Sequence, residues 1–318
     1  MAHGSTRVVL TALAGNAAIA VTKLGAALFT GSAAMFSEAI HSGVDTGNQF
    51  LLLLGMRRAA RPASPQHPFG HGLELYFWAF VVAILIFGAG AVVSINHGLH
   101  RIAHPEPIQN AWVNYLVLGL SMLFEGGAWL VAWKEFNRQR GTRSVLKELR
   151  SSKDPTVFTV LFEDTAAMAG LIIALLGVLL SQVLHMPVID GFASIGVGVV
   201  LAITAAFLAL ESHSLLTGES VYPETRASIV RLATAEPEVE RLNQALTMHF
   251  GPQEVLCALS LDFRDSVSAA EVERAVTRIE KAIKAAHPEV ARIFVEAQGF
   301  DADRRGSPKP PEDPAVPT

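Results

Sequence analysis

The sequence predicts an α-helical membrane protein: six transmembrane helices followed by a small α+β cytoplasmic domain. Hydrophobic residues make up 51% of the 318 residues and charged residues 17%, whereas charged residues account for about 25% of soluble domains. The apolar residues gather in six stretches, each near the ~20 residues that span a bilayer. A more polar segment follows. We therefore expect a transmembrane domain over residues 1–210, a cytoplasmic domain over 211–300 and a disordered tail over 301–318.

The six apolar stretches are separated by short polar loops. The first stretch continues without a small-residue cleavage site, so we expect a retained transmembrane helix rather than a signal peptide. The expected spans are Val8–Phe29, Ala33–Met56, Leu73–Asn96, Ala111–Trp133, Thr156–Leu180 and Ile189–Leu210.

The charges of the loops predict the orientation of the spans. The loops after the second and fourth spans hold ten basic residues, whereas the other three loops together hold only Arg101. Cytoplasmic loops carry the excess of lysine and arginine. Both basic loops and both termini are therefore expected in the cytoplasm, and a bacterial inner membrane is the expected location.

The segment after residue 211 reads as an αββαβ sandwich. Alternating apolar residues and a Gly251-Pro252 turn indicate two paired strands. Ser268 followed by Glu271 is a capping box at a helix start. The expected elements are helix Glu224–Ala235, strands Ala245–Phe250 and Val255–Phe263, helix Ser268–His287 and strand Val290–Ala297.

Charge and cysteine content exclude several classes of function. The net charge is -4, which gives no indication of a nucleic-acid partner. Cys257 is the only cysteine, so the chain has no intrachain disulfide framework and no cysteine-rich zinc site. A transition metal would have to be held by histidine, aspartate and glutamate.

A polar stripe crosses the second span. Its residues are spaced by three, four and three positions, which places them on one helical face: Glu38, His41, Asp45 and Asn48. Polar groups inside a membrane are costly and indicate function. His41 and Asp45, one turn apart, form a half-site for a divalent metal. Asn48 and Gln49 can equally be explained by hydrogen bonds between helices.

The fifth span contributes a second pair of carboxylates, Glu163 and Asp164. Adjacent residues point about 100° apart on a helix, so one can face the second span while the other faces a different neighbour. We expect Asp164 to be the direct metal ligand and Glu163 to be a second ligand or a proton carrier. The alternative is a helix cap or an interfacial charge near the membrane surface.

Further candidate groups lie outside these two spans. Glu125 in the fourth span is either a proton site, a ligand or the partner of Lys23 in the first span. In the cytoplasmic loop, His67 and His71 flank a glycine turn and could hold a second metal, with solvated histidines as the alternative. Asp190 is interpreted as a helix cap.

The C-terminal segment offers one weaker candidate. His249, Asp262 and Glu296 sit on expected strands and could form a regulatory metal site. Solvated strand residues explain them more simply, because no dense cluster of histidines or cysteines marks a site.

Taken together, these motifs resemble the cation diffusion facilitator family. The resemblance rests on SEAIHSGVDTGNQ in the second span, HPFGHGLELYFW opening the third, a carboxylate in the fifth, PVIDGFASIGVG opening the sixth and the αββαβ segment. It covers about residues 7 to 298. It implies a homodimeric, proton-coupled exporter of Zn²⁺ or a similar divalent ion, with a transport site between the second and fifth spans. It also implies a ferredoxin-like cytoplasmic domain.

The chain departs from the common pattern of that family at two positions. Many members carry a ligand four residues before the one matched by Asp164, where this chain has Val160, and Glu163 is the candidate that could replace the missing ligand. Leu73 replaces a lysine that is common in the loop motif. These departures resemble the branch of mitochondrial-type zinc transporters, with Zn²⁺ as the expected substrate and Co²⁺, Mn²⁺, Fe²⁺ and Cd²⁺ as alternatives.

Two functions other than transport are also compatible with parts of the sequence. A metal sensor or scaffold that retained the fold would explain the incomplete half-site in the fifth span. A membrane di-iron oxygenase would need the histidines near 67–71 and 97–104 to share one iron pair, but the predicted orientation puts these clusters on opposite faces of the membrane.

Overall fold

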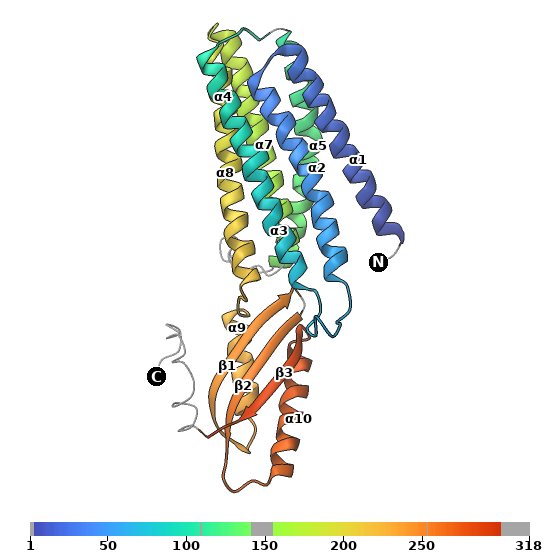
Figure 1. The fold of residues 1–318 in the computed structure, drawn as a ribbon, viewed down its shortest axis with the longest axis vertical. Coiled ribbons are helices and arrows are strands. Elements are labelled where there is room, and N and C mark those ends of the chain that lie inside the picture. The colour runs from blue at the N-terminus through green and yellow to red at the C-terminus, as the bar shows by residue number, and fades with distance from the viewer. Residues whose placement is uncertain (1–2, 109, 141–154, 253, 300–318) are drawn as a thin grey trace. The chain divides into compact units, whose positions relative to one another are not determined.

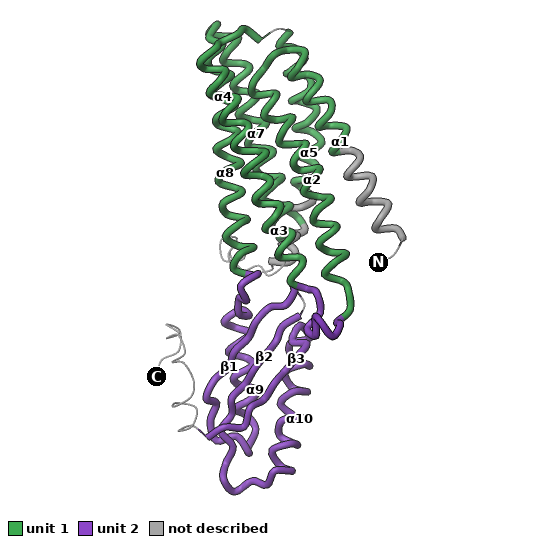
Figure 2. Tube along the Cα trace, viewed as in Figure 1, with its two compact units in different colours: residues 1–62, 73–214 green, residues 63–72, 215–318 purple. Residues whose placement is uncertain are grey.

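The computed structural model describes residues 3–108, 110–140, 155–252 and 254–299. It divides into two compact units (Figure 2). The first comprises residues 1–62 and 73–214, and the second comprises residues 63–72 and 215–318. The polar loop 63–72 thus belongs to the same compact unit as the C-terminal segment, although more than 140 residues separate them in the sequence.

The first unit is a bundle of long helices (Figure 1). The third helical segment is continuous but changes type, from α-helix through a π-helical stretch (η1) and back to α-helix. The bounds are α1 His3–Thr30, α2 Ala33–Ala59, α3 Leu73–Leu85, η1 Ile86–Val92, α4 Val93–Ala103, α5 Ala111–Arg140, α7 Pro155–Val183 and α8 Val188–Leu216.

Four helical segments of the described chain are long and apolar enough to cross a membrane. They are Leu73–Ala103, Ala111–Leu130, Thr159–Val183 and Val188–Leu216. The apolar part of α1 that is described, Asn16–Thr30, is shorter. Helix α2 has 27 residues, enough for about 40 Å at 1.5 Å per residue, but its polar stripe lowers its hydropathy. The structure thus confirms a mostly helical protein with strongly apolar helices.

The first two helices are joined by a tight turn at Gly31, which has a φ of +69°. The buried carboxylate of Asp190, in the first turn of α8, accepts hydrogen bonds from Ser32 Oγ and from the backbone N–H groups of Ala33 and Ala34. Asp190 lies in α8, but its carboxylate caps the start of another helix, α2. Because these N–H groups have no partner inside α2, this contact stabilises the start of the helix that carries the polar stripe.

The second unit is a small α+β fold. Its sheet has the order β1-β2-β3, with β1 and β2 antiparallel and β2 and β3 parallel. The parallel pair is connected through a helix, as a parallel crossover requires. The elements are α9 Pro223–Thr234, β1 Val239–Gly251, β2 Glu254–Phe263, α10 Ala269–Ala286 and β3 Val290–Ala297. The element order αββαβ matches the sequence prediction, although β1 begins six residues earlier than expected.

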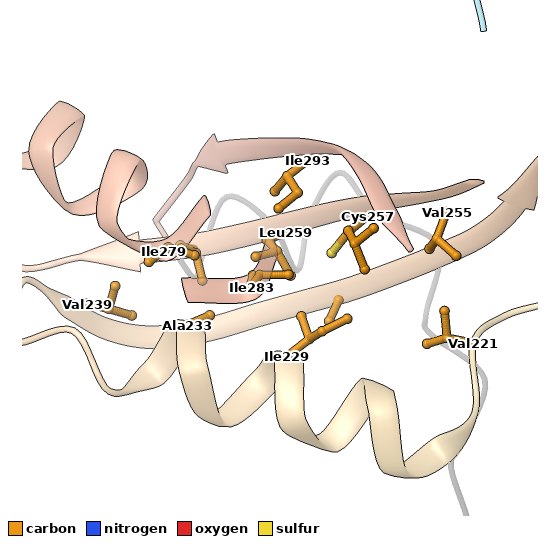
Figure 3. Packing of buried hydrophobic residues seen from close by; sticks show 13 residues of the cluster. Val221, Ile229, Ala233, Val239, Val255, Cys257, Leu259, Ile279, Ile283 and Ile293 are labelled. Carbon is orange, nitrogen blue, oxygen red and sulfur yellow. The ribbon is translucent and has the colours of Figure 1, made fainter. Parts of the chain in front are cut away.

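Aliphatic residues from both helices pack against the sheet and form the core of this unit (Figure 3). Ile229 of α9 and Ile279 and Ile283 of α10 are fully buried against β2 residues such as Leu259. At the start of α10, the Glu271 carboxylate accepts hydrogen bonds from the Ser268 backbone N–H and hydroxyl, at 2.7 and 2.8 Å. These bonds satisfy part of the predicted capping box.

Loop 63–72 is held on this unit by aromatic and cationic contacts. The Phe69 ring stacks on Phe250 of β1 with centroids 5.1 Å apart. The Arg292 guanidinium lies over the Phe69 ring at 5.2 Å and donates a hydrogen bond to the Pro68 carbonyl at 3.0 Å. A side chain at Gly72 would collide with the Phe250 carbonyl. The connection between the second and third helices is thus anchored within the C-terminal unit.

Candidate functional site

The polar stripe of α2 faces the inside of the helical bundle. His41 is 2% exposed, and its Nδ1 atom lies 3.3 Å from Oδ1 of Asp45, which is 18% exposed. Neither ring nitrogen of His41 has a hydrogen-bond partner. Buried polar atoms almost always have such partners. The structure thus places a buried imidazole beside a carboxylate on one face of α2.

Glu163 on α7 faces this stripe. It is 6% exposed, and its Oε1 accepts a 2.8 Å hydrogen bond from the Asn48 side-chain amide. Asn48, for which the sequence predicts either a functional or a packing role, therefore connects α2 to α7. Its neighbour Asp164 is only half-buried. The two adjacent carboxylates point in different directions, and Glu163 is the one that hydrogen-bonds to α2.

The two predicted half-sites lie close together. Asp45 interacts electrostatically with Glu163 and Asp164 of α7 and also with Glu125 of α5. Among the described residues, no three histidine, cysteine, aspartate or glutamate side chains are already arranged to hold a metal ion. The structure therefore brings the polar side chains of α2 and α7 near one another without assembling a coordination shell among the described residues. Val160, at the position where a further ligand was expected, is 37% exposed.

A buried lysine lies next to the stripe. Lys23 of α1 is inaccessible to solvent, and its Nζ atom contacts Glu125 Oε1 at 2.7 Å, Ser42 Oγ at 2.8 Å and Glu38 Oε2 at 3.2 Å. The sequence had suggested the Lys23–Glu125 pair as one alternative, and the structure confirms it. The additional contacts with Glu38 and Ser42 were not expected.

Close packing of α2 and α7 depends on a small residue. A Cβ atom at Gly170 would collide with Glu38 Oε1. Ala166 and Ala167, which precede it by one turn, are buried at 3% and 4% exposure. The small residues that follow Glu163 in the sequence thus permit the close approach that brings its carboxylate to Asn48.

The loop histidines lie beside each other. The rings of His67 and His71 have centroids 4.4 Å apart with a tilt of 35°. The glycine between them, Gly70, has a φ of +86°, and its N–H donates to the His67 carbonyl at 3.0 Å. Nδ1 of His71 is buried without a hydrogen-bond partner. The turn thus places the two imidazole rings side by side.

The three candidate residues of the C-terminal sheet are not brought together. His249 pairs with Val255 near one end of β2, whereas Asp262 lies seven residues further along that strand. At about 3.3 Å per residue, this separation is about 23 Å. Glu296 on β3 is exposed. A shared metal site of these three residues has no support in the structure. His249 is buried rather than solvated, with an exposed fraction of 4%.

The sequence indicates Lys23 and Asn48 but not all of their partners: the contacts of Lys23 with Glu38 and Ser42, and the bond from Asn48 to Glu163, come from the structure. Lys23 is the single basic residue within Val8–Phe29, and a lone charge in a span needs partners. Asn48 continues the spacing of the stripe by one turn. Sequence spacing identifies such residues but does not show which residue of another helix each one meets.

The sequence is similar to those of known metal transporters. A family model described as the cation efflux transmembrane domain matches residues 9–217. The proton-coupled zinc antiporter SLC30A9, mitochondrial, of Mus musculus is 35% identical over 301 residues, which cover 94% of this chain. The protein of the same name from Homo sapiens is 35% identical over 300 residues, also 94% of this chain.

The lengths of these relatives differ from that of the chain. The matched region is 49% of the mouse and human proteins, so the chain spans about half the length of each. The cation-efflux pump FieF of Klebsiella pneumoniae (strain 342) is 24% identical over 278 residues, covering 87% of both proteins.

Proposed function

The chain belongs to the cation efflux family, and on this premise we propose that it exports a divalent metal cation, Zn²⁺, from the cytoplasm in exchange for protons. The family consists of transporters, so the chain is an integral membrane protein and not an enzyme. The observation that supports a metal substrate best is His41, a buried imidazole that has no hydrogen-bond partner and lies 3.3 Å from the Asp45 carboxylate.

In the proposed site, the cation lies between α2 and α7. His41 and Asp45 bind it from α2, and Asp164 binds it from α7 with Glu163 as a further ligand or proton carrier. Zn²⁺ accepts nitrogen and oxygen ligands in a tetrahedral shell. Because the half-sites are adjacent but not assembled, a small movement of α7 against α2 completes the shell. The same movement in reverse releases the ion.

Proton coupling follows from the chemistry of the ligands. A histidine binds metal only when its ring is neutral, and carboxylates bind it only when they are ionised. Binding of the cation therefore displaces protons from these groups. Protons that arrive from the outer side compete for the same groups and favour release there. Rocking of the helices exposes the site alternately to the two sides of the membrane.

The remaining features complete the proposal. The protein has six transmembrane helices, of which α1 and α2 are less apolar than the other four. Both termini lie in the cytoplasm of a bacterial cell. It functions as a homodimer through a ferredoxin-like cytoplasmic domain.

His67 and His71 form a second, cytoplasmic metal site, which the proximity of their rings supports. The relatives, a proton-coupled zinc antiporter and a cation-efflux pump, support the assignment of the substrate.

A metal sensor that does not transport is the second candidate. It is favoured by two observations: Glu163 accepts a hydrogen bond from Asn48, and Val160 supplies no ligand. A panel of Zn²⁺, Co²⁺, Mn²⁺, Fe²⁺ and Cd²⁺, assayed for binding and for transport in parallel, separates the two candidates. A transporter moves zinc and loses this activity in Glu163→Ala and in Asp164→Ala. The exposed Glu106→Gln variant is the control. A sensor binds metal but moves none.

A further inference from the structure

The ammonium group of Lys23 uses all of its hydrogen-bond donors inside the helical bundle. Its three donors meet one acceptor each, on Glu38, Ser42 and Glu125. These contacts join α1 to α2 and to α5. The side chain is fully buried and does not reach solvent along its stem. A lysine that only covered an apolar surface would extend its charge to water.

A structural connection alone does not need this charge. Neutral serine, threonine and asparagine side chains connect membrane helices at much lower cost than a buried ion. The numbers of basic and acidic groups in this cluster also differ, because one ammonium faces two carboxyl groups. Glu38 Oε1 and Glu125 Oε2 are buried without hydrogen-bond partners. The positive charge of Lys23 is therefore the property that needs an explanation.

The cluster adjoins the two ligands of α2. Ser42, which accepts from Lys23, directly follows His41 and lies on the helical turn that ends at Asp45. The charge of Lys23 acts on both His41 and Asp45, and Glu125 acts on Asp45 as well. Lys23 thus touches neither proposed ligand but is close enough to alter the potential that a cation experiences between them.

We propose that Lys23 sets the metal affinity of the transport site: its fixed charge repels the bound divalent cation and keeps binding weak enough for release. The inference rests on the proposed function. A site rich in carboxylates holds a divalent ion tightly, and a transporter that never releases its ion does not turn over. Electrostatic repulsion across a low-dielectric interior offsets part of that attraction. In this role Lys23 positions no ligand and contacts no metal.

Binding and transport by four full-length proteins test the proposal: wild type, Lys23→Met, Lys23→Arg and Lys23→Met/Glu125→Gln. Zinc Kd is measured by titration calorimetry in detergent, and initial transport rates are measured against zinc concentration in liposomes. Lys23→Met is expected to bind zinc about tenfold more tightly, with KM and the maximal rate both reduced. Lys23→Arg keeps the charge and the wild-type Kd. The double variant removes one charge of each sign and returns Kd towards the wild-type value.

Several outcomes overturn the proposal. An unchanged or weaker Kd in a folded Lys23→Met shows that Lys23 is only a structural link. A double variant that binds much more weakly than wild type shows that Glu125 is itself a ligand. If Lys23→Met does not fold, Glu125→Gln takes its place, and an unchanged affinity there contradicts the electrostatic role. Wild-type protein that binds zinc without transporting it contradicts the proposed function instead, while the effect of Lys23 on Kd can still be measured.

Discussion

The side-chain amide of Asn48 on α2 donates a 2.8 Å hydrogen bond to the carboxylate of Glu163 on α7. Both side chains are buried. The bond connects the helix that carries His41 and Asp45 to the helix that carries the second pair of carboxylates. The relative position of the two half-sites therefore depends on a residue that is not itself a proposed ligand.

Replacement of Asn48 by alanine tests this dependence. The hydrogen bond that orients Glu163 is lost, and loss of such an outer-shell partner commonly costs about tenfold or more in metal affinity. We expect a zinc affinity about tenfold lower by titration calorimetry. Gln49→Ala, on the neighbouring position of the same helix, is the control. Equal affinities of Asn48→Ala and wild type would show that the bond does not support the site.

Gly170→Ala tests the close approach of α7 to Glu38. The added methyl group collides with the Glu38 carboxylate, and overpacking of this kind typically costs about 1–3 kcal/mol. Thermal unfolding in detergent is expected to show a lower midpoint. Gly25→Ala is the matched control, because nothing lies within 4 Å of a Cβ at that position. An unaltered midpoint in Gly170→Ala would mean that the Glu38 carboxylate moves aside and is not fixed at this contact.

The thiol of Cys257 reports on the C-terminal unit. Burial in the core raises the pKa of Cys257 to about 11, whereas an exposed thiol titrates near 8.5. At pH 8, the smaller thiolate fraction alone slows alkylation of the native protein about 200-fold relative to the unfolded chain. Mass spectrometry after timed maleimide treatment measures both rates. Equal rates would contradict a buried thiol.

The same pKa shift makes a prediction about pH. The folded protein holds the thiol proton more tightly than the unfolded chain does. The stability that this provides is fully present below about pH 8.5 and is lost as the pH rises towards about 11. Cys257→Ala removes this contribution, so its unfolding midpoint is expected to fall less steeply across that pH range. Parallel slopes for the two proteins would contradict the prediction.

Part of this site could be predicted from the sequence because it lies within one helix. The spacing of His41 and Asp45 fixes them on one face whatever surrounds α2. The pairing of Lys23 with Glu125 could be proposed from charge, because a lone ion in a span requires a partner. The helices and strands of the C-terminal unit followed from alternation, a glycine-proline turn and a capping box.

The remaining features depend on how separate elements pack. The rotation of α7 decides that Glu163 rather than Asp164 bonds to Asn48, and periodicity along one chain does not encode that rotation. Helix α8 supplies Asp190 as a cap for α2, across 156 residues of sequence. The assignment of loop 63–72 to the C-terminal unit depends on Phe69, Phe250 and Arg292 meeting in space.

Zinc transport by His41→Ala/Asp45→Ala tests the central claim most directly. Purified wild-type and variant proteins are reconstituted into liposomes with an acidic lumen, and entry of Zn²⁺ is followed with a dye inside the vesicles. The wild type is expected to accumulate zinc and to release luminal protons, and both signals stop when the proton gradient is collapsed. The double variant is expected to show neither signal. Undiminished zinc transport by the folded double variant would contradict a metal pathway through α2.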